Sequence, residues 1–248
     1  MEARCPSCGK PVPQAGKGYY CPYCAASLAN VQDDEIIQAE EVVSYYSPWD
    51  DRENLGFFKA LFDTWVQAIL NPVKFFSKMP PEGGIGGPLL YGFIMGEIGL
   101  LVALVWQGMS VFVPSFLHYE SMDYIAAPMA GMTFLFFFSP ILVIVGLFIA
   151  AAVLHLCLLL VGVAGRGFET TFRVVCYASS THLLMLLPFC GGMIGGIWNL
   201  VLQIIGLREA HETTTVRSVL AVFLPAIICC GITFLGVMVF LSRFRAGY

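Results

Sequence analysis

Charged side chains are scarce in this 248-residue chain: Asp, Glu, Lys and Arg make up 12% of it, while 58% of the residues are hydrophobic. Soluble domains average about 25% charged residues, so this composition excludes a uniformly water-soluble enzyme. The charges are also uneven, because residues 1–88 hold 11 of the 17 acidic and 7 of the 13 basic side chains. The sequence therefore predicts a polar N-terminal part followed by a body that lies in lipid.

The chain also lacks a surplus of positive charge and a leader peptide. Its formal net charge is −4, which argues against nucleic acid as a partner. Residues 1–30 contain no apolar stretch of the kind that a cleavable signal peptide needs. We therefore expect membrane insertion to use the internal apolar segments.

Four cysteines near the N-terminus form two pairs, Cys5-Pro-Ser-Cys8 and Cys21-Pro-Tyr-Cys24, with twelve residues between the pairs. This spacing places four thiolates around one ion and predicts a zinc ribbon over residues 1–27, with one structural Zn²⁺. Histidine follows neither pair, which excludes covalent haem attachment. Iron in the same cage and two disulfides are the alternatives.

Residues 28–54 are acidic and poor in large apolar groups, which predicts a flexible linker. Residues 55–80 follow a helical pattern that Asn71-Pro72 divides into two helices. The second helix carries Phe75 and Phe76 between lysines, which is typical of an amphipathic helix lying in the plane of the lipid headgroups. The alternative is that these helices pack on the membrane domain as ordinary core.

Long apolar segments predict an all-α fold, in which a five-segment helical transmembrane bundle spans residues 86–242. The run 128–163 would be about 54 Å long as one helix, which exceeds the apolar thickness of a bilayer, about 30 Å. We therefore expect a break at Pro140, with 128–139 as an interfacial or kinked lead-in. The two shortest segments are either two thin spans or one re-entrant hairpin. The five segments are about 89–113, 141–163, 172–187, 192–207 and 218–241.

Basic residues alternate between the loops of this bundle. The loops 164–173 and 208–217 each contain two arginines, whereas 114–127 and 188–191 contain neither lysine nor arginine. The positive-inside rule then predicts a multi-pass protein of the cell (inner) membrane with a cytoplasmic N-terminus and an external C-terminus. Arg243 and Arg245 are the exception to this rule. A cytoplasmic N-terminus favours metal over disulfides at the four cysteines.

Four polar residues of the apolar segments are expected at about the same depth, roughly 12–15 Å from the cytoplasmic end of their helices. An ionisable side chain within a span suggests a functional site. These residues could form a proton relay, a cation site or a headgroup site. The alternative is a satisfied hydrogen-bonding network that fixes the register of the helices. The four residues are Glu97, His155, His182 and Asn199.

Two stretches resemble the Yip1 family of multi-pass membrane proteins: residues 165–178, which begin Gly-Arg-Gly-Phe-Glu-Thr-Thr-Phe-Arg, and residues 206–211, Gly-Leu-Arg-Glu-Ala-His. Pro48-Trp49-Asp50 and Asn71-Pro72 resemble the prokaryotic branch of the family that carries a zinc ribbon. The resemblance covers about residues 48–241 and implies the same five segments and orientation. It transfers no catalytic residue.

The eukaryotic relatives are implicated in vesicle traffic and bind Rab-type small GTPases through their N-terminal regions. Here that region is a ribbon and an acidic linker, so the resemblance does not identify the partner. The charged residues of the two basic loops are expected to form an ion-pair network between the loops at the membrane surface. These residues are Arg166, Glu169, Arg173, Arg208, Glu209 and His211.

The sequence thus favours a non-enzymatic membrane adaptor or organiser in the lipid bilayer, which meets a cytoplasmic protein through its ribbon and linker. Homo-oligomerisation is left open. A small transporter or channel built around Glu97, His155 and His182 is the alternative. An enzyme is the weakest interpretation, because the sequence has no nucleophile–base pair and no ligand spacing for a catalytic metal.

Metal analysis of residues 1–30 tests the predicted ribbon. We expect one bound Zn²⁺ per chain, held by Cys5, Cys8, Cys21 and Cys24, because the fold has too little core to form without it. A peptide with four free thiols and no bound metal would contradict the prediction.

Overall fold

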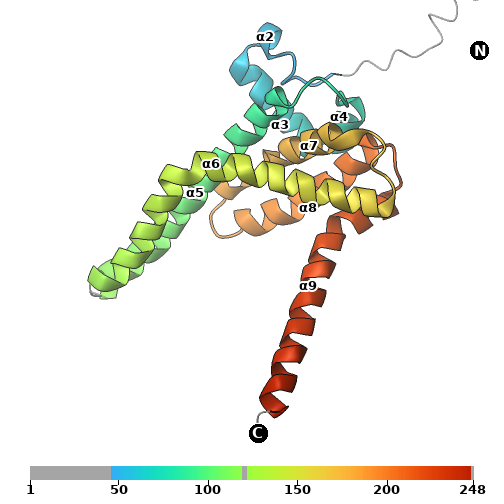
Figure 1. Cartoon of the computed structure of the whole chain (residues 1–248). Coiled ribbons are helices and arrows are strands. Elements are labelled where there is room, and N and C mark those ends of the chain that lie inside the picture. The colour runs from blue at the N-terminus through green and yellow to red at the C-terminus, as the bar shows by residue number, and fades with distance from the viewer. Residues whose placement is uncertain (1–45, 119–121, 247–248) are drawn as a thin grey trace, which may run out of the picture. The chain divides into compact units, whose positions relative to one another are not determined.

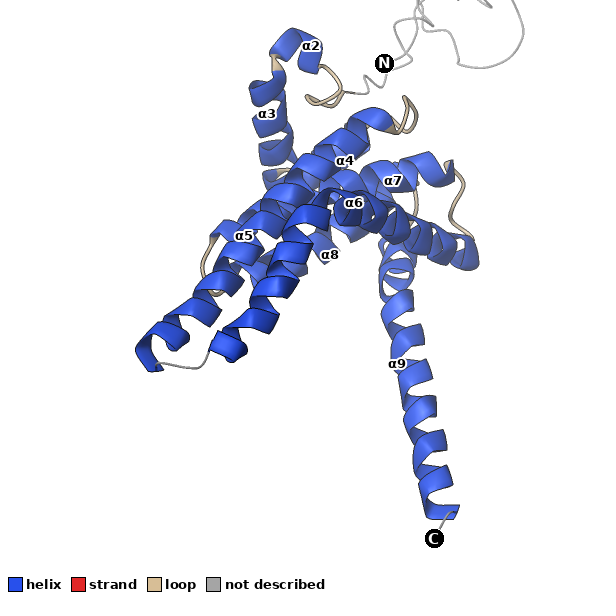
Figure 2. Ribbon diagram, turned by 60° about the vertical axis from the view of Figure 1, so that its left-hand side comes forward, coloured by secondary structure: helices blue, strands red, loops and turns tan. Residues whose placement is uncertain are grey.

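The computed structural model describes residues 46–118 and 122–246, so the predicted ribbon and residues 28–45 of the linker lie outside the described residues. The described part is helical and contains no strand (Figures 1 and 2). Its elements in chain order are α2 (Arg52–Leu55), α3 (Phe57–Leu70), α4 (Pro72–Lys78), α5 (Gly86–His118), α6 (Met122–Val161), α7 (Gly167–Ala178), the 3₁₀ helix η1 (Ser179–Leu186), α8 (Gly191–Ala210) and α9 (Thr215–Ala246).

Three helices of the described part are long and apolar enough to cross a membrane. They cover Gly86–Val113 in α5, Ala127–Val161 in α6 and Thr215–Arg243 in α9. These helices support a membrane protein, with candidate spans at the first, second and fifth predicted segments. The other two predicted segments, 172–187 and 192–207, correspond to α7 with η1 and to α8, which are not among these three helices. The five-segment count therefore stays a prediction.

The break predicted at Pro140 is wrong, because α6 continues through Pro128 and Pro140 as one helix. Figure 1 shows that α6 bends partway along its length, so the kinked alternative for 128–139 describes it better. Proline has no N–H to donate to the carbonyl four residues earlier, which is that of Phe136. Instead, the Ser139 hydroxyl lies 3.0 Å from this carbonyl oxygen and supplies a donor in place of the missing backbone N–H.

Helix α7 lies at the centre of the packing. Every residue from 170 to 178 is buried, and the helix packs against α5, α6 and α8. At Ser179 the chain tightens into η1, where the hydroxyls of Ser179 and Ser180 donate to carbonyls three residues earlier, at 2.6 and 2.7 Å. Such local hydrogen bonds compete with the α-helical pattern, and here they accompany the change to a 3₁₀ helix.

Helix α4 packs on the bundle, and Phe75 and Phe76 face protein, which favours the alternative that this helix packs on the membrane domain as core. Both side chains are at most 2% exposed, and Phe75 meets the ring of Tyr177 edge-on at a centroid distance of 5.2 Å. Gly206 permits the close packing of α8 on Phe76 of α4 and on Val174 of α7, because a Cβ at residue 206 would lie 2.6 Å from Val174 and 3.1 Å from Phe76. The amphipathic face of α4 is therefore protein core.

Helix α3 has one face on the protein and one face free. Ala60, Thr64 and Ala68 are fully buried, whereas Phe58 and Phe62 are 81% and 60% exposed. Both predicted alternatives therefore apply to residues 55–80: packing describes α4 and the inner face of α3, and the outer face of α3 keeps the pattern expected of an interfacial helix.

Helix α9 contacts α6 and α8 through its first turns, where Ser218, Ala221 and Val222 are buried. Beyond these turns, between residues 227 and 238, its large apolar side chains are exposed. Figure 2 shows the ribbon of this part of α9 extending past the other helices. This surface is typical of a helix that faces lipid.

Candidate functional site

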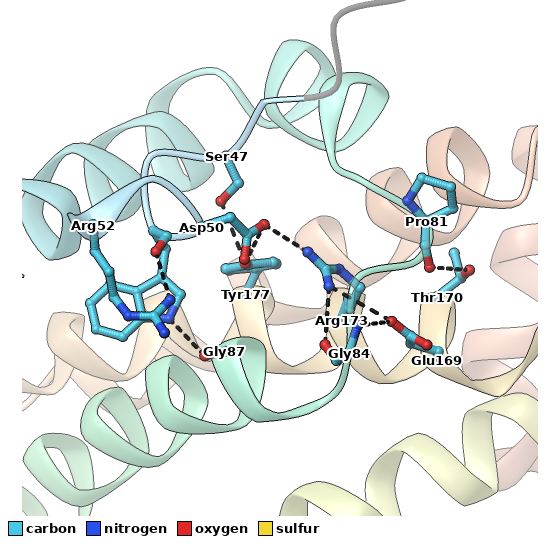
Figure 3. A network of polar contacts seen from close by, with 11 residues as sticks. Ser47, Asp50, Arg52, Pro81, Gly84, Gly87, Glu169, Thr170, Arg173 and Tyr177 are labelled. Atoms are coloured by element: carbon cyan, nitrogen blue, oxygen red, sulfur yellow. Dashed lines mark hydrogen bonds and ion pairs between the residues drawn. The ribbon is translucent and has the colours of Figure 1, made fainter. Parts of the chain in front are cut away.

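Arg173 lies on α7 with 1% of its side chain exposed. Its Nη2 donates to Oδ2 of Asp50 at 2.7 Å, and its Nη1 donates to the carbonyl of Gly84 at 3.1 Å (Figure 3). Glu169, one turn earlier on α7, has its Oε1 3.8 Å from the same Nη1. A buried guanidinium is tolerated only when it is paired and hydrogen-bonded, and these three partners supply that compensation.

Asp50 reaches Arg173 because residues 46–52, which we call the Trp49 strap, are fixed on the bundle. Trp49 is fully buried, and its Nε1 donates to the carbonyl of Gly87 at 2.6 Å. At the start of the strap, the N–H of Tyr46 donates to the carbonyl of Lys78 at 2.8 Å. The predicted flexible linker 28–54 is therefore too long, since its last residues are packed against the membrane domain.

The loop between α4 and α5 closes over Arg173 from the other side. Gly84 has φ +92°, a conformation that L side chains rarely adopt. In this conformation its N–H donates to Glu169 Oε1 at 2.7 Å while its carbonyl accepts from Arg173. One glycine thus binds both an acidic and a basic side chain of α7.

Tyr177 completes the network one turn beyond Arg173. Its hydroxyl lies 3.4 Å from both carboxylate oxygens of Asp50, and Ser47 donates to it at 3.4 Å (Figure 3). A tyrosine hydroxyl is neutral at physiological pH, so Tyr177 can donate to Asp50. The strap is therefore bound to α7 by charge and by hydrogen bonds.

A second polar cluster joins α6, α7 and the turn after α8. His155 Nδ1 lies 3.0 Å from the hydroxyl of Thr171, which in turn lies 3.0 Å from His211 Nε2. Burial lowers the pKa of His211 to about 4, and the positive charges of His155 and Arg166 act in the same direction. We conclude that His211 is neutral at physiological pH.

The predicted network between the basic loops is present at one pair: Arg166, beside α7, binds Glu212 in the turn after α8. Arg208 instead pairs with its neighbour Glu209. Arg173 and Glu169, predicted in the same network, belong to the strap site. The loop residues thus divide between the strap site, the histidine cluster, the pair Arg166–Glu212 and the pair Arg208–Glu209.

The four polar residues predicted to lie within the membrane have separate partners, and no hydrogen bond or ion pair of the described residues joins any two of them. The carboxyl group of Glu97 contacts Ser139, and His155 contacts Thr171. The amide of Asn199 donates to the carbonyl of Ala178 at 3.0 Å, and His182 packs on Gly99. Similar depth therefore does not bring these side chains to one point.

The predicted zinc ligands Cys5, Cys8, Cys21 and Cys24 lie outside the described residues. Within 46–118 and 122–246, no group of three or more His, Cys, Asp or Glu side chains is placed to hold a metal ion. The geometry around Arg173 is that of a structural clamp, since both Nη atoms bind groups of the protein itself, and Nε is buried without a hydrogen-bond partner.

Sequence reasoning places Glu169 in one network with Arg173 but misses the other residues of this site. It assigns Asp50 to the linker and gives no role to Gly84 or Tyr177. The one available signal was the resemblance of Pro48-Trp49-Asp50 to a family motif, which marked this segment without naming its contact.

The fold and the site define an integral membrane protein made of helices. A family model, the Yip1 domain, matches residues 66–238, and the chain belongs to the Yip1 family. Comparison with curated proteins and with solved structures finds no match. The family assignment from the sequence is confirmed, whereas the ribbon and the prokaryotic branch stay predictions.

Replacing Arg173 by methionine tests the clamp. We expect the free energy of unfolding to fall by about 3 kcal/mol, because Asp50 and Glu169 lose their cation. Arg166→Met is the matched control, since Glu212 has 70% of its side chain exposed and an exposed pair contributes less than about 1 kcal/mol. Unfolding of the purified protein in detergent measures both variants, and equal losses would contradict the account.

The histidine cluster predicts a pH dependence of stability. The pKa of His211 falls from 6.5 to about 4 on folding, so between these values the unfolded chain binds a proton that the folded chain does not. The free energy of unfolding should therefore decrease as the pH falls from about 6.5 to about 4. Thermal unfolding across this range should show a smaller decrease in His211→Gln, and the same slope in both proteins would contradict the assignment.

Proposed function

We propose that this Yip1-family protein is a non-enzymatic membrane adaptor, which holds its N-terminal segment at a fixed place on the membrane domain for a cytoplasmic protein partner. The observation that supports this proposal is the Trp49 strap. Its tryptophan is fully buried, and Asp50 forms an ion pair with a buried arginine of the central helix. A segment that only linked the N-terminal residues to the membrane domain would need neither the buried tryptophan nor the ion pair.

The strap fixes the point on the membrane domain to which the preceding residues, 1–45, are joined. If residues 28–45 form the flexible linker that their composition predicts, an 18-residue chain has a root-mean-square reach of about 24 Å. A zinc ribbon at residues 1–27 would then be tethered to the membrane domain, and the tether would raise its effective concentration for any partner that also contacts this domain. In this proposal, Zn²⁺ folds the ribbon and the strap positions it.

The proposed orientation places the strap, the ribbon and both basic loops on the cytoplasmic side of the cell membrane. The exposed Lys59, Lys74 and Lys78 belong to the same proposed side. Lysines beside a span favour the cytoplasmic leaflet, which supports this orientation.

A transporter built around Glu97, His155 and His182 has less support. A transport site needs polar groups that converge on one passage, whereas these three side chains contact Ser139, Thr171 and Gly99, on different elements. No nucleophile–base pair emerges in the described structure that would support an enzyme.

Deletion of residues 1–30 separates the two functions. For an adaptor, the full-length protein in detergent should capture a cytoplasmic protein that the deletion variant, and a Cys5→Ser, Cys8→Ser variant, fail to capture. Glu97→Gln should retain the partner, because its change is confined to the span. Capture that survives the deletion, or that is lost in Glu97→Gln alone, would contradict the adaptor.

A further inference from the structure

The middle of α6 contains a carbonyl that lacks the usual backbone hydrogen bond from four residues later in the helix. Residue 140 is a proline, so the backbone hydrogen bond to the carbonyl of Phe136 does not form. In the apolar part of a membrane no water replaces it, and another donor must be found. The hydroxyl oxygen of Ser139, which is 2% exposed, lies 3.0 Å from this carbonyl oxygen.

The same hydroxyl oxygen lies 2.9 Å from Oε2 of Glu97 on α5. A serine hydroxyl has one hydrogen, so it can donate to Phe136 or to Glu97, but not fully to both. If it donates to the carbonyl, the short contact with Glu97 needs a hydrogen on the carboxyl group. The arrangement that satisfies every atom of this contact is a carboxylic acid, in which Glu97 Oε2–H donates to Ser139 and Ser139 donates to Phe136.

The opposite arrangement leaves two acceptors unpaired. A serine that donated to a Glu97 carboxylate would abandon the carbonyl of Phe136. The other carboxylate oxygen, Oε1, is buried and has no hydrogen-bond partner. A charged oxygen without a partner in an apolar environment is far more costly than a neutral one.

No positive side chain compensates Glu97 from the elements that pack on α5, which are α6, α7 and η1. Residues 132–154 of α6 include no titratable side chain. From η1, His182 lies against Gly99, and residues 97 and 99 are about 200° apart around the helix axis. From α7, Cys176 lies against Gly92, and Arg173, Glu169 and Tyr177 belong to the strap site.

We propose that Glu97 is an intramembrane proton-binding site whose proton completes the hydrogen bonding of the bend in α6. The bound proton lies between Oε2 and the oxygen of Ser139. When the proton leaves, the hydroxyl hydrogen of Ser139 turns to the carboxylate, and the carbonyl of Phe136 loses its donor. Protonation of Glu97 and the geometry of the bend are therefore linked.

Infrared difference spectroscopy on the full-length protein in lipid tests the protonation. At neutral pH, the spectrum of wild type minus Glu97→Gln should contain the carbonyl stretch of one protonated carboxylic acid. Glu212→Gln is the control, because its ion-paired, exposed carboxylate should change the carboxylate bands alone. If Glu97→Gln does not fold, Glu97→Asp should shift the acid band instead. A Glu97 variant that changes carboxylate bands alone would overturn the proposal.

A double-mutant cycle tests the link to the bend. Ser139→Ala removes the donor of the Phe136 carbonyl, so the midpoint of thermal unfolding should fall by several degrees. Pro140→Ala supplies a backbone N–H to that carbonyl, and in this background Ser139→Ala should cost much less. Ser139→Thr retains a hydroxyl and should resemble wild type. An equal loss from Ser139→Ala in both backgrounds would overturn the link.

Discussion

The buried charge of Arg173 is the constraint on which the rest of this structure depends. A guanidinium on a helix that is buried on all sides cannot be left without partners. Its partners come from segments far apart in the chain: Asp50 from the strap, Gly84 from the loop after α4, and Glu169 from α7 itself. Satisfying one side chain therefore fixes the strap and the loop against the same helix.

The remaining contacts of the central segment follow a similar logic. Where α7 gives way to the 3₁₀ helix η1, the backbone hydrogen-bonding pattern changes, and carbonyls near this change accept hydrogen bonds from side chains of other elements. Trp65 of α3 donates to the carbonyl of Ser180, Trp106 of α5 donates to that of Met185, and Asn199 of α8 donates to that of Ala178. The helices around α7 and η1 are thus held by side chains that satisfy its backbone, in addition to apolar packing.

The sequence predicted the features that depend on local pattern. Apolar runs located the helices of the three spans, and Asn71-Pro72 placed the boundary between α3 and α4, where Pro72 is the first helical residue. It did not predict which face of a helix meets which neighbour. Phe75 and Phe76 fit an interfacial helix as well as a buried one, because an apolar face is the same pattern against lipid or protein.

The polar residues show the same limit. The depth of a residue along a helix can be counted from the sequence. Its direction around the helix axis advances by about 100° per residue, and the packing of the bundle determines which neighbour a side chain then faces. Glu97 and His182 consequently meet different neighbours at a similar depth. The pair Asp50–Arg173 spans 123 residues, and no local pattern indicates such a contact. The pattern predicts a break at Pro140, but α6 continues through it, and the hydroxyl of Ser139 lies 3.0 Å from the carbonyl oxygen of Phe136 that the proline leaves without a backbone donor.

The central claim is that Arg173 holds the Trp49 strap on the membrane domain. Amide hydrogen exchange of residues 46–56 in the full-length protein measures this directly. The account predicts slow exchange across the strap in wild type and in Arg166→Met, and fast exchange in Arg173→Met while the spans stay protected. Fast exchange of the strap in wild type, or unchanged protection in Arg173→Met, would contradict it.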